Sequence, residues 1–157
     1  MAGNAPTFEI PTLPNAKVAI ISARWHREIC QSMVDGAKRA LSLAGINSPR
    51  LVEVAGSYEL PLAAKYALDA GADAAIVLGV VVRGETPHFD YVCQGVTDGV
   101  MKVSLESGKP IGFGVLTVDT IEQASARSGI PGSKEDKGFD SAVAALDLLK
   151  IKKELVN

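Results

Sequence analysis

The sequence predicts an α/β protein, a three-layer α/β/α sandwich in which helices cover both faces of a central four-stranded parallel sheet. Short apolar runs rich in β-branched residues alternate along the chain with longer segments of helical period. The strand-like runs are mostly apolar throughout, which is typical of parallel strands covered on both faces. Glycines stand where the helical segments should end. The length of 157 residues suits one domain.

The first half of the chain is expected to contain two strand–helix units. The run 18–22 predicts a first strand, and apolar residues at every third or fourth position predict a helix over 26–44. The run 51–55 predicts a second strand, and Pro61 suits the first turn of a helix that continues to Ala70. Each unit has the chain order of a crossover between parallel strands.

The second half repeats the alternation. A third strand is expected over 74–82, a third helix over 89–107 and a fourth strand over 111–116. A short helix over 120–129 begins with the residues TIEQ, which resemble a capping box. A last helix over 137–153 closes the chain.

Composition excludes several classes of protein. The 16 basic and 18 acidic residues give a net charge of −2, so no basic excess is present to bind nucleic acid or an anionic membrane surface. The longest apolar run, 74–82, is far shorter than the ~20 residues that span a bilayer. The N-terminus does not resemble a secretory signal, so we expect a cytoplasmic protein. Cys30 and Cys93 have no metal-ligand spacing and are expected to be packed, unreactive thiols.

Residues 1–15 differ from the rest of the chain. This segment carries three prolines and few large apolar residues, so it is not expected to form a central strand. It is interpreted as a loose tail or as an arm that lies on another surface. The packed domain is expected to cover residues 16–157.

Polar and aromatic residues directly follow the four predicted strands. Because ligands of open α/β sheets bind beyond the carboxyl ends of the strands, these residues are the first candidates for a site. The only Trp and both His are among them. The candidates are Arg24, Trp25, His26, Gly56, Ser57, Tyr58, Glu59, Arg83, Gly84, Glu85, Thr86, Pro87, His88, Thr117, Asp119 and Thr120.

The loop after the third strand suits an anion such as phosphate. Gly84 permits close approach of the backbone, Thr86 suits a helix N-cap, and Pro87 suits the first helical position. The helix N-terminus that follows offers free N–H groups and a positive dipole end. Glu85 would bind through its backbone N–H with its side chain turned away. The dipole disfavours imidazolium, so His88 is predicted to be neutral and able to accept a proton; the alternative is a capping or exposed histidine.

Other candidates have two readings. Trp25 either stacks on a planar heterocycle or is a partly buried core residue. Glu59 either accepts hydrogen bonds from hydroxyl groups or is an ordinary exposed carboxylate. Arg127 and Lys137, taken alone, would be surface charges.

Four segments together resemble the 6,7-dimethyl-8-ribityllumazine synthase family. They are GETPHFDYV at 84–92, GFGVLT at 112–117, EQA at 122–124 followed by Arg127, and DKG at 136–138. The resemblance covers about residues 16–150 and implies a flavodoxin-like fold. It also implies a transferase of riboflavin biosynthesis, which condenses 5-amino-6-(D-ribitylamino)uracil with 3,4-dihydroxy-2-butanone 4-phosphate. The products are 6,7-dimethyl-8-ribityllumazine, phosphate and water, and no cofactor or metal is needed.

The resemblance implies roles for residues that would bind the uracil substrate. Trp25 would stack on the pyrimidine ring, Ser57 and Glu59 would hold the ribityl chain, and Lys137 would reach the heterocycle. Tyr58 departs from the family, in which a smaller residue is usual, and so affects the shape of the pocket.

Further roles follow for the walls of the pocket. Val80, Val81 and Val82 would offer backbone groups and apolar surface to the ring. Phe113 would line the ring pocket from an adjacent subunit.

The phosphate would be bound by a separate set of residues. Gly84, Glu85 and Thr86 would contact it through backbone N–H groups and the Thr86 hydroxyl, and Arg127 would pair with it. His88 would be the catalytic residue that transfers protons. A guanidinium is suited to phosphate oxygens, so the role of Arg127 fits its chemistry.

The resemblance also implies a homo-oligomer. Members of the family form pentamers, some of which build a shell of 60 subunits, and each site lies between neighbouring subunits. The arm 1–15 would lie against a neighbour. The segment 128–136 looks longer than in shell-forming relatives, so a free pentamer is expected. Association with riboflavin synthase is a further implied partner.

Two alternatives remain open from the sequence. A doubly wound domain with an aromatic residue after its first strand could be a non-catalytic flavin-binding module, as in flavodoxins. The segment 22–26 lacks the small hydroxyl residues that usually wrap a flavin phosphate. The other alternative is a structural shell with a vestigial site.

Overall fold

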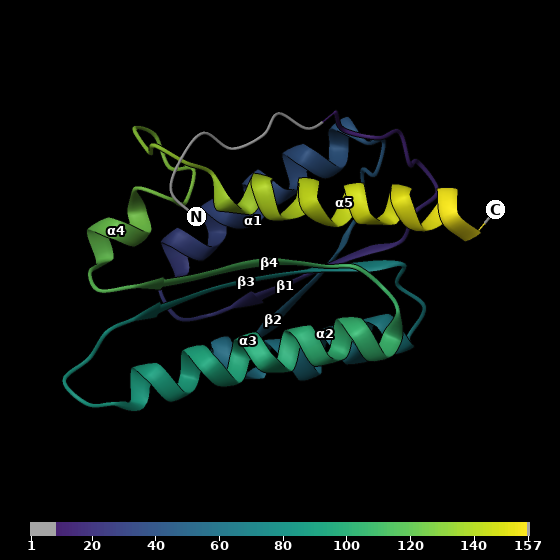
Figure 1. The fold of residues 1–157 in the computed structure, drawn as a ribbon. Helices are drawn as coiled ribbons and strands as arrows, with labels where there is room; N and C mark the ends of the chain where they lie inside the picture. Colours follow the sequence, from purple (N-terminus) through teal and green to yellow (C-terminus); the bar gives the residue numbers. More distant parts are fainter. Residues whose placement is uncertain (1–8, 157) are drawn as a thin grey trace.

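Four parallel strands in the order β2-β1-β3-β4 form the central sheet of the computed structural model, which describes residues 9–156 (Figure 1). The strands are β1 (Val18–Ala23), β2 (Arg50–Val54), β3 (Ala74–Val82) and β4 (Ile111–Val118). All three strand pairs are parallel. The strand order is that of the first four strands of a flavodoxin-like sheet, as expected.

Helices cover both faces of the sheet. The elements α1 and α5 pack on one face, and α2 and α3 cover the other (Figure 1). The bounds are α1 (Arg27–Leu43), α2 (Leu60–Asp69), α3 (His88–Ser107), α4 (Ile121–Ser125) and α5 (Lys137–Val156), with a 3-10 turn, η1 (Ser57–Glu59), before α2. The predicted three-layer sandwich is therefore confirmed.

The strands supply alternate side chains to two separate cores. Val18 and Ile20 point into the core beneath α1 and α5, whereas Ala19 and Ile21 point into the core beneath α2 and α3. Every residue of β1 is buried, because the strand is central in the sheet and helices cover both of its faces. At the edge of the sheet, by contrast, β2 exposes Leu51, so the expectation of full burial fails for that strand.

The helices α1 and α5 cross at close range. A Cβ atom built on Gly138 would overlap the backbone carbonyl of Met33, so only glycine fits at this crossing. At Gly36 a Cβ atom would overlap the carboxylate of Asp136, so a larger residue there would displace that side chain. That carboxylate pairs with Arg39 of α1 and accepts the N–H of Phe139 at 2.9 Å. The start of α5 is thereby held against α1.

Element boundaries differ from the predicted ones near the end of the chain. The strand β4 extends two residues further, to Val118. The helix α4 ends at Ser125 and does not continue toward Gly129. A connection folds back here, with a bridge between Ser128 and Asp136. The helix α5 continues three residues further, to Val156.

The described part of the N-terminal segment packs on its own chain. Leu13 is buried in the core under α1, and its N–H donates to the carbonyl of Ala44 at 2.8 Å. The packed domain therefore begins within the segment expected to be an arm. Residues 1–8, which carry the rest of the predicted arm, lie outside the described residues. Within residues 9–156, no helix is both long and apolar enough to cross a membrane.

Candidate functional site

The carboxyl ends of the strands lie at one edge of the sheet, together with the starts of α1, α3 and α4 (Figure 1). Parallel pairing through every strand produces this alignment. The segments after β1 and β2 are also joined directly, because Arg24 N–H donates to the carbonyl of Val54 at 3.0 Å. The predicted gathering of loops at one edge is therefore present.

Trp25 and Glu59 meet beside Gly56. A Cβ atom built on Gly56 would lie 3.4 Å from Trp25 Cδ1 and 3.3 Å from Glu59 Oε2. The backbone N–H of Gly56 donates to Glu59 Oε2 at 2.8 Å, which holds the carboxylate in place. The Trp25 residue is 68% exposed, so the alternative of a core tryptophan is wrong. A flat aromatic face and a fixed acceptor thus lie side by side in solvent.

The turn into α1 explains why Trp25 is exposed. His26 is the N-cap of α1 and has a left-handed backbone conformation, with φ of 53°. This conformation is uncommon outside glycine. It redirects the chain between Trp25 and the helix. Cys30 is buried one turn into α1, and its Sγ donates to the Trp25 carbonyl at 3.2 Å.

Ser57 and Tyr58 point to different surroundings. Ser57 is buried, and its hydroxyl donates to the Val80 carbonyl at 3.5 Å, which ties η1 to β3. Tyr58 is exposed, and its ring lies over Gly95 of α3. Val80 is buried, while Val81 and Val82 are half-buried toward the end of the strand.

The loop after β3 is exposed, and the N-cap of its helix lies one position later than predicted. The first intrahelical carbonyl is that of Pro87, which accepts the N–H of Asp90 at 2.9 Å, so Pro87 is the N-cap and His88 the first helical residue. The expectation that Thr86 caps α3 is therefore wrong by one position, and Pro87 makes no side-chain capping bond. Gly84, Glu85, Thr86 and His88 are all exposed.

A second group of predicted residues lies along the edge strand β4. Phe113, Arg127 and Lys137 line a cavity of about 340 Å³ together with Gln123 and the end of β4. Arg127 Nη1 donates to the Gln123 carbonyl at 2.8 Å. Because β4 ends the sheet and Phe113 is 42% exposed, this surface faces outward. We call Phe113, Arg127 and Lys137 the β4-edge group.

Both cations of this group lie close to carboxylates. Lys137 pairs with Glu135 and with Asp140, the latter at 3.1 Å. The hydrogen bond to Glu135 raises the pKa of Lys137, and the same bond lowers the pKa of Glu135. Arg127 Nε also lies 4.0 Å from the Glu135 carboxylate. Glu135 thus neutralises part of the positive charge that an anion would meet here.

The other predicted residues form the strand-end group, which comprises Trp25, Ser57, Tyr58, Glu59, Val80, Val81, Val82, Gly84, Glu85, Thr86 and His88. Within the described part of one chain, Phe113 of the β4-edge group lies far from Trp25 of the strand-end group. Phe113 lies five residues before Val118, or about 16 Å from the carboxyl end of β4 at the usual rise per residue. The strand β3 also separates β4 from β1, which leads to Trp25. Phe113 and Trp25 therefore cannot contact one ring within a single chain.

The sequence reasoning gave no role to Arg83, Asp119 or Gln123. Arg83 Nε donates to Asp119 Oδ1 at 2.7 Å, and Asp119 N–H donates to Gln123 Oε1 at 2.9 Å. The signal was present as a basic residue at the end of β3 and an acidic residue just after β4. It becomes meaningful only when β3 and β4 are known to be neighbours.

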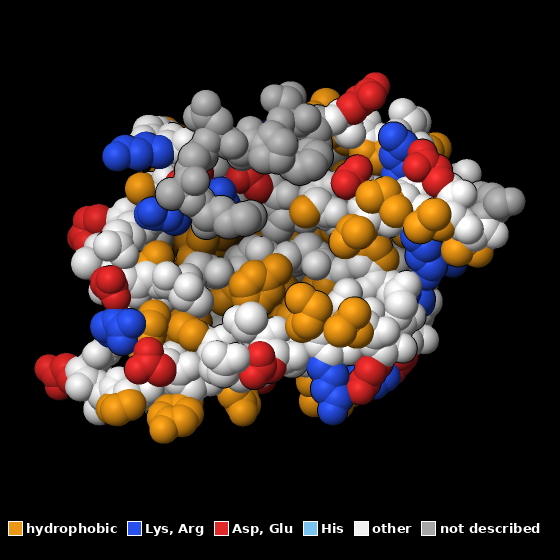
Figure 2. All heavy atoms as spheres, in the orientation of Figure 1, with side chains coloured by type: hydrophobic (Ala, Val, Ile, Leu, Met, Phe, Trp, Pro, Cys, Tyr) orange, Lys and Arg blue, Asp and Glu red, His pale blue; other side chains and the backbone are white. Residues whose placement is uncertain are grey.

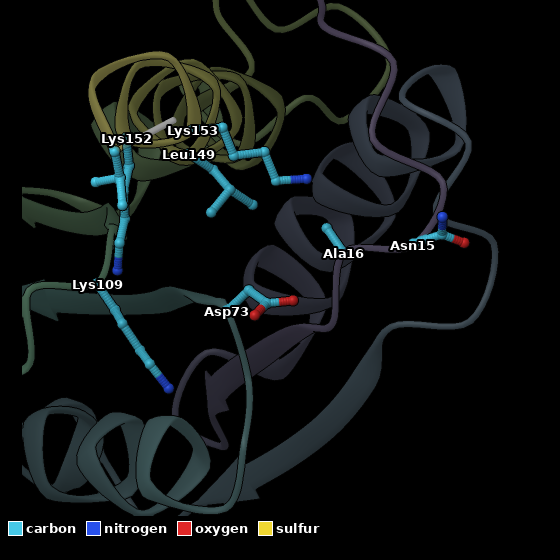
Figure 3. Close-up of a pocket in the computed structure, with 8 residues that line it drawn as sticks. Asn15, Ala16, Asp73, Lys109, Leu149, Lys152 and Lys153 are labelled. Atoms are coloured by element: carbon cyan, nitrogen blue, oxygen red, sulfur yellow. The ribbon is translucent and has the colours of Figure 1, made fainter.

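A second cavity lies at the amino ends of the strands, opposite the candidate site. This cavity has a volume of about 350 Å³, and its lining includes Asp73, Lys109, Lys152 and Lys153 (Figure 3). Lys109 Nζ donates to the carbonyls of Leu68 and Ala72, so it closes the end of α2. Lys152 Nζ donates to the Gly108 carbonyl after α3. Two of these ammonium groups therefore join helix ends, and the cavity contains none of the predicted site residues.

A doubly wound α/β domain with aromatic, carboxylate and imidazole groups beyond its strand ends belongs to the class that binds small molecules at the carboxyl edge of its sheet. The sequence model of the 6,7-dimethyl-8-ribityllumazine synthase family matches residues 15–153. The chain belongs to this family.

Relatives bearing the family name cover nearly the whole chain. The 6,7-dimethyl-8-ribityllumazine synthase of Streptomyces coelicolor is 53% identical over 142 residues, which is 90% of this chain and 88% of that protein. The protein of the same name from Streptomyces avermitilis is 52% identical, with the same coverage. The one from Paenarthrobacter aurescens is 52% identical over 93% of this chain and 94% of its own.

Proposed function

We propose that this protein condenses 5-amino-6-(D-ribitylamino)uracil with 3,4-dihydroxy-2-butanone 4-phosphate to form 6,7-dimethyl-8-ribityllumazine, phosphate and water. This reaction makes it a transferase of riboflavin biosynthesis. The match to the family over residues 15–153 carries the proposal. The exposed Trp25 beside the anchored Glu59 supports it, because the uracil substrate needs a stacking surface for its ring and acceptors for its hydroxyl groups.

The uracil substrate would bind along the ends of β1, β2 and β3. Its ring stacks on Trp25, and the ribityl hydroxyl groups donate to the Glu59 carboxylate, which the N–H of Gly56 holds in place. Val81 and Val82 supply half-buried apolar surface beside the ring. Ser57 is already bonded to the Val80 carbonyl, so it shapes this wall and can offer its backbone to the ribityl chain.

The phosphate of the second substrate would bind at the exposed loop before α3. Gly84 has open space where a Cβ atom would stand, so an anion can approach its backbone closely. The start of α3 adds a positive dipole end. An arginine supplies fixed charge for phosphate binding and departure, and Arg127 is the candidate.

His88 would transfer the protons of the reaction from the first turn of α3. The free amine of the uracil attacks the ketone, and water leaves to give an imine. Loss of the C3 proton and departure of phosphate from C4 then leave an enol at the former C3 hydroxyl, which tautomerises to a ketone. The second amine attacks this new ketone and closes the ring with loss of water. Each addition needs a base to take a proton from nitrogen, and each departure needs an acid. An exposed imidazole beside the phosphate loop can do both.

A second copy of the chain would complete the site with its β4-edge group. Phe113 is too far from Trp25 to contact the same ring within one chain. Exposed apolar side chains lie on the three elements that border this edge: Met101, Leu105, Phe113, Leu148 and Ile151. Figure 2 shows apolar side chains gathered across the middle of the face on which β4 lies between α5 and α3 in Figure 1. Such a surface favours a neighbouring subunit.

We favour a homopentamer, with the 60-subunit shell as the alternative. The segment 128–136 supports the smaller assembly, because its exposed tip, Pro131–Gly132, would stand in the way of packing between pentamers. Sedimentation velocity separates monomer, pentamer and shell. A neighbour contact through residues 1–8, a cytoplasmic location and an association with riboflavin synthase stay predictions.

The direct test of the reaction mixes the purified protein with both substrates. We expect a lumazine product, seen by its absorbance and fluorescence, and release of inorganic phosphate in equal amount. Tight flavin binding without condensation would instead favour the flavin-binding module, and an inert pentamer would favour a structural shell. The family match does not favour either alternative.

A further inference from the structure

Arg83 lies directly after β3 and contacts residues on two other segments. Its Nε donates to Asp119 Oδ1 at 2.7 Å, and its Nη1 lies 3.4 Å from Asp90 Oδ1. The guanidinium carbon also lies 4.2 Å from the centre of the Phe89 ring. Asp119 follows β4, whereas Phe89 and Asp90 are the second and third residues of α3. One side chain therefore joins the start of α3 to the segment before α4.

These contacts continue as far as Arg127. Asp119 N–H donates to Gln123 Oε1 at 2.9 Å, which holds Asp119 against the first turn of α4. Gln123 N–H donates to Thr120 Oγ1 at 3.3 Å, as the N-cap bond of that turn. The Gln123 carbonyl then accepts Arg127 Nη1 at 2.8 Å. A sequence of contacts thus runs from His88 and its neighbours, through Arg83 and Asp119, to the guanidinium of Arg127.

We propose that Arg83 and Asp119 form a positioning pair for the reaction. The pair sets the phosphate loop 84–87 and His88 at a fixed place relative to β4 and α4. This inference rests on the proposed function, since it concerns the same phosphate loop. Arg83 and Asp119 act without touching substrate, through the backbone and side chains that they hold.

The exposure of the pair argues that its main role is not to stabilise the fold. The side chains of Arg83 and Asp119 are 48% and 64% exposed, and surface ion pairs contribute little to global stability. The loop is different, because Gly84, Glu85 and Thr86 are exposed and have little packing to hold them. The Arg83–Asp119 contact can therefore fix the position of this loop even though it adds little to global stability. Small displacements of catalytic groups reduce rates strongly.

The chain offers a matched control on α2. Lys65 and Asp69 form an ion pair at 2.8 Å with side chains 48% and 58% exposed, close to the values for Arg83 and Asp119. The Lys65 pair joins two residues of the same helix, so it connects no separate segments. Removing it tests the effect of losing an exposed ion pair alone.

The experiment compares Arg83→Gln, Asp119→Asn, the double variant, Arg83→Lys and Lys65→Gln. We expect Arg83→Gln and Asp119→Asn each to lower kcat/KM for the butanone phosphate about tenfold, with the KM for the uracil substrate changed less than about twofold. The double variant should resemble the single ones, because either change removes the same contact. Arg83→Lys should recover part of the loss. Lys65→Gln should match the wild type, and all five should keep its melting temperature.

Amide hydrogen exchange provides a readout that does not depend on activity. Exchange at residues 84–90 should rise in Arg83→Gln and Asp119→Asn but not in Lys65→Gln. Wild-type kinetics together with wild-type exchange in the Arg83 and Asp119 variants would overturn the positioning pair. Additive losses in the double variant, or equal rises in both KM values, would also overturn it. An inactive wild-type protein would instead refute the proposed function, and exchange would still test the pair.

Discussion

Trp25 and Glu59 both lie beside Gly56, each within 3.5 Å of the point where a side chain at Gly56 would begin. The two residues come from segments that follow different strands, β1 and β2. Their meeting point lacks a side chain, so the aromatic face and the carboxylate can approach each other. This relationship gives the site a heterocycle surface and a hydroxyl acceptor at one place.

Gly56→Ala should therefore disturb binding of the uracil substrate more than folding. The Gly56 backbone is extended, with φ of −151°, so alanine fits without strain. Its methyl group would lie 3.3 Å from Glu59 Oε2 and push the carboxylate by a few tenths of an ångström. We expect KM for the uracil substrate to rise several-fold while the melting temperature stays within about 2 °C.

Trp25→Phe, which keeps an aromatic face, should retain activity, whereas Trp25→Ala should not.

Arg127→Ala should raise KM for the butanone phosphate about tenfold or more, because charge-assisted hydrogen bonds to phosphate are lost. Steady-state kinetics with each substrate varied in turn measures it. Lys134→Ala is the control, since Lys134 is an exposed cation of the same connection and should have no effect. An unchanged KM for the butanone phosphate in Arg127→Ala would refute the assignment of the phosphate to this residue.

Gly138→Ala should destabilise the fold by about 1–3 kcal/mol, because its methyl group would overlap the Met33 carbonyl at the crossing of α1 and α5. Chemical denaturation measures the loss. Gly84→Ala serves as the comparison, since a Cβ atom there meets open space, and it should leave stability unchanged. Equal stability of the two variants would contradict the close packing of α1 on α5.

The buried thiol of Cys30 should lower the free energy of unfolding as the pH rises through the alkaline range. Burial raises its pKa from 9.0 to about 11. Between those values the unfolded chain loses the thiol proton and the native chain keeps it, so this group lowers the free energy of unfolding as pH rises, by up to about 1.4 kcal/mol per pH unit. In denaturation experiments over this pH range, the free energy of unfolding of Cys30→Ala should decline less steeply than that of the wild type. Parallel curves for the two proteins would contradict the expected burial effect.

Regular structure could be predicted because periodicity and glycine stops are local signals. The strand at 74–82 was predicted with its observed limits, and the helix that follows it was predicted with its observed end at Ser107. The start of α3 was missed by one residue, because Thr86 and Pro87 both suit a helix start and only the hydrogen bond from Asp90 decides between them. Leu13 was missed because the prolines around it hide a single buried side chain.

The site was less predictable, because it depends on strand order. The nearness of Trp25 and Glu59 could be predicted, because the segments after parallel strands gather where the strands end. The separate place of Phe113, on the outer edge of the sheet, could not be predicted without knowing the position of β4. The contact of Arg83 with Asp119 likewise joins residues 36 positions apart and needs the neighbouring places of β3 and β4.

We propose that each site uses the strand-end group of one copy and the β4-edge group of another. The most direct measurement mixes His88→Ala chains with Arg127→Ala chains in equal amount, by co-expression or by refolding together, and assays condensation. At a butanone phosphate concentration well below its KM, each variant alone should keep about a tenth of wild-type activity or less, and a mixed oligomer should recover about a quarter, because some neighbouring pairs combine both intact groups. Mixed oligomers as inactive as the parent variants would show that each site lies within one chain.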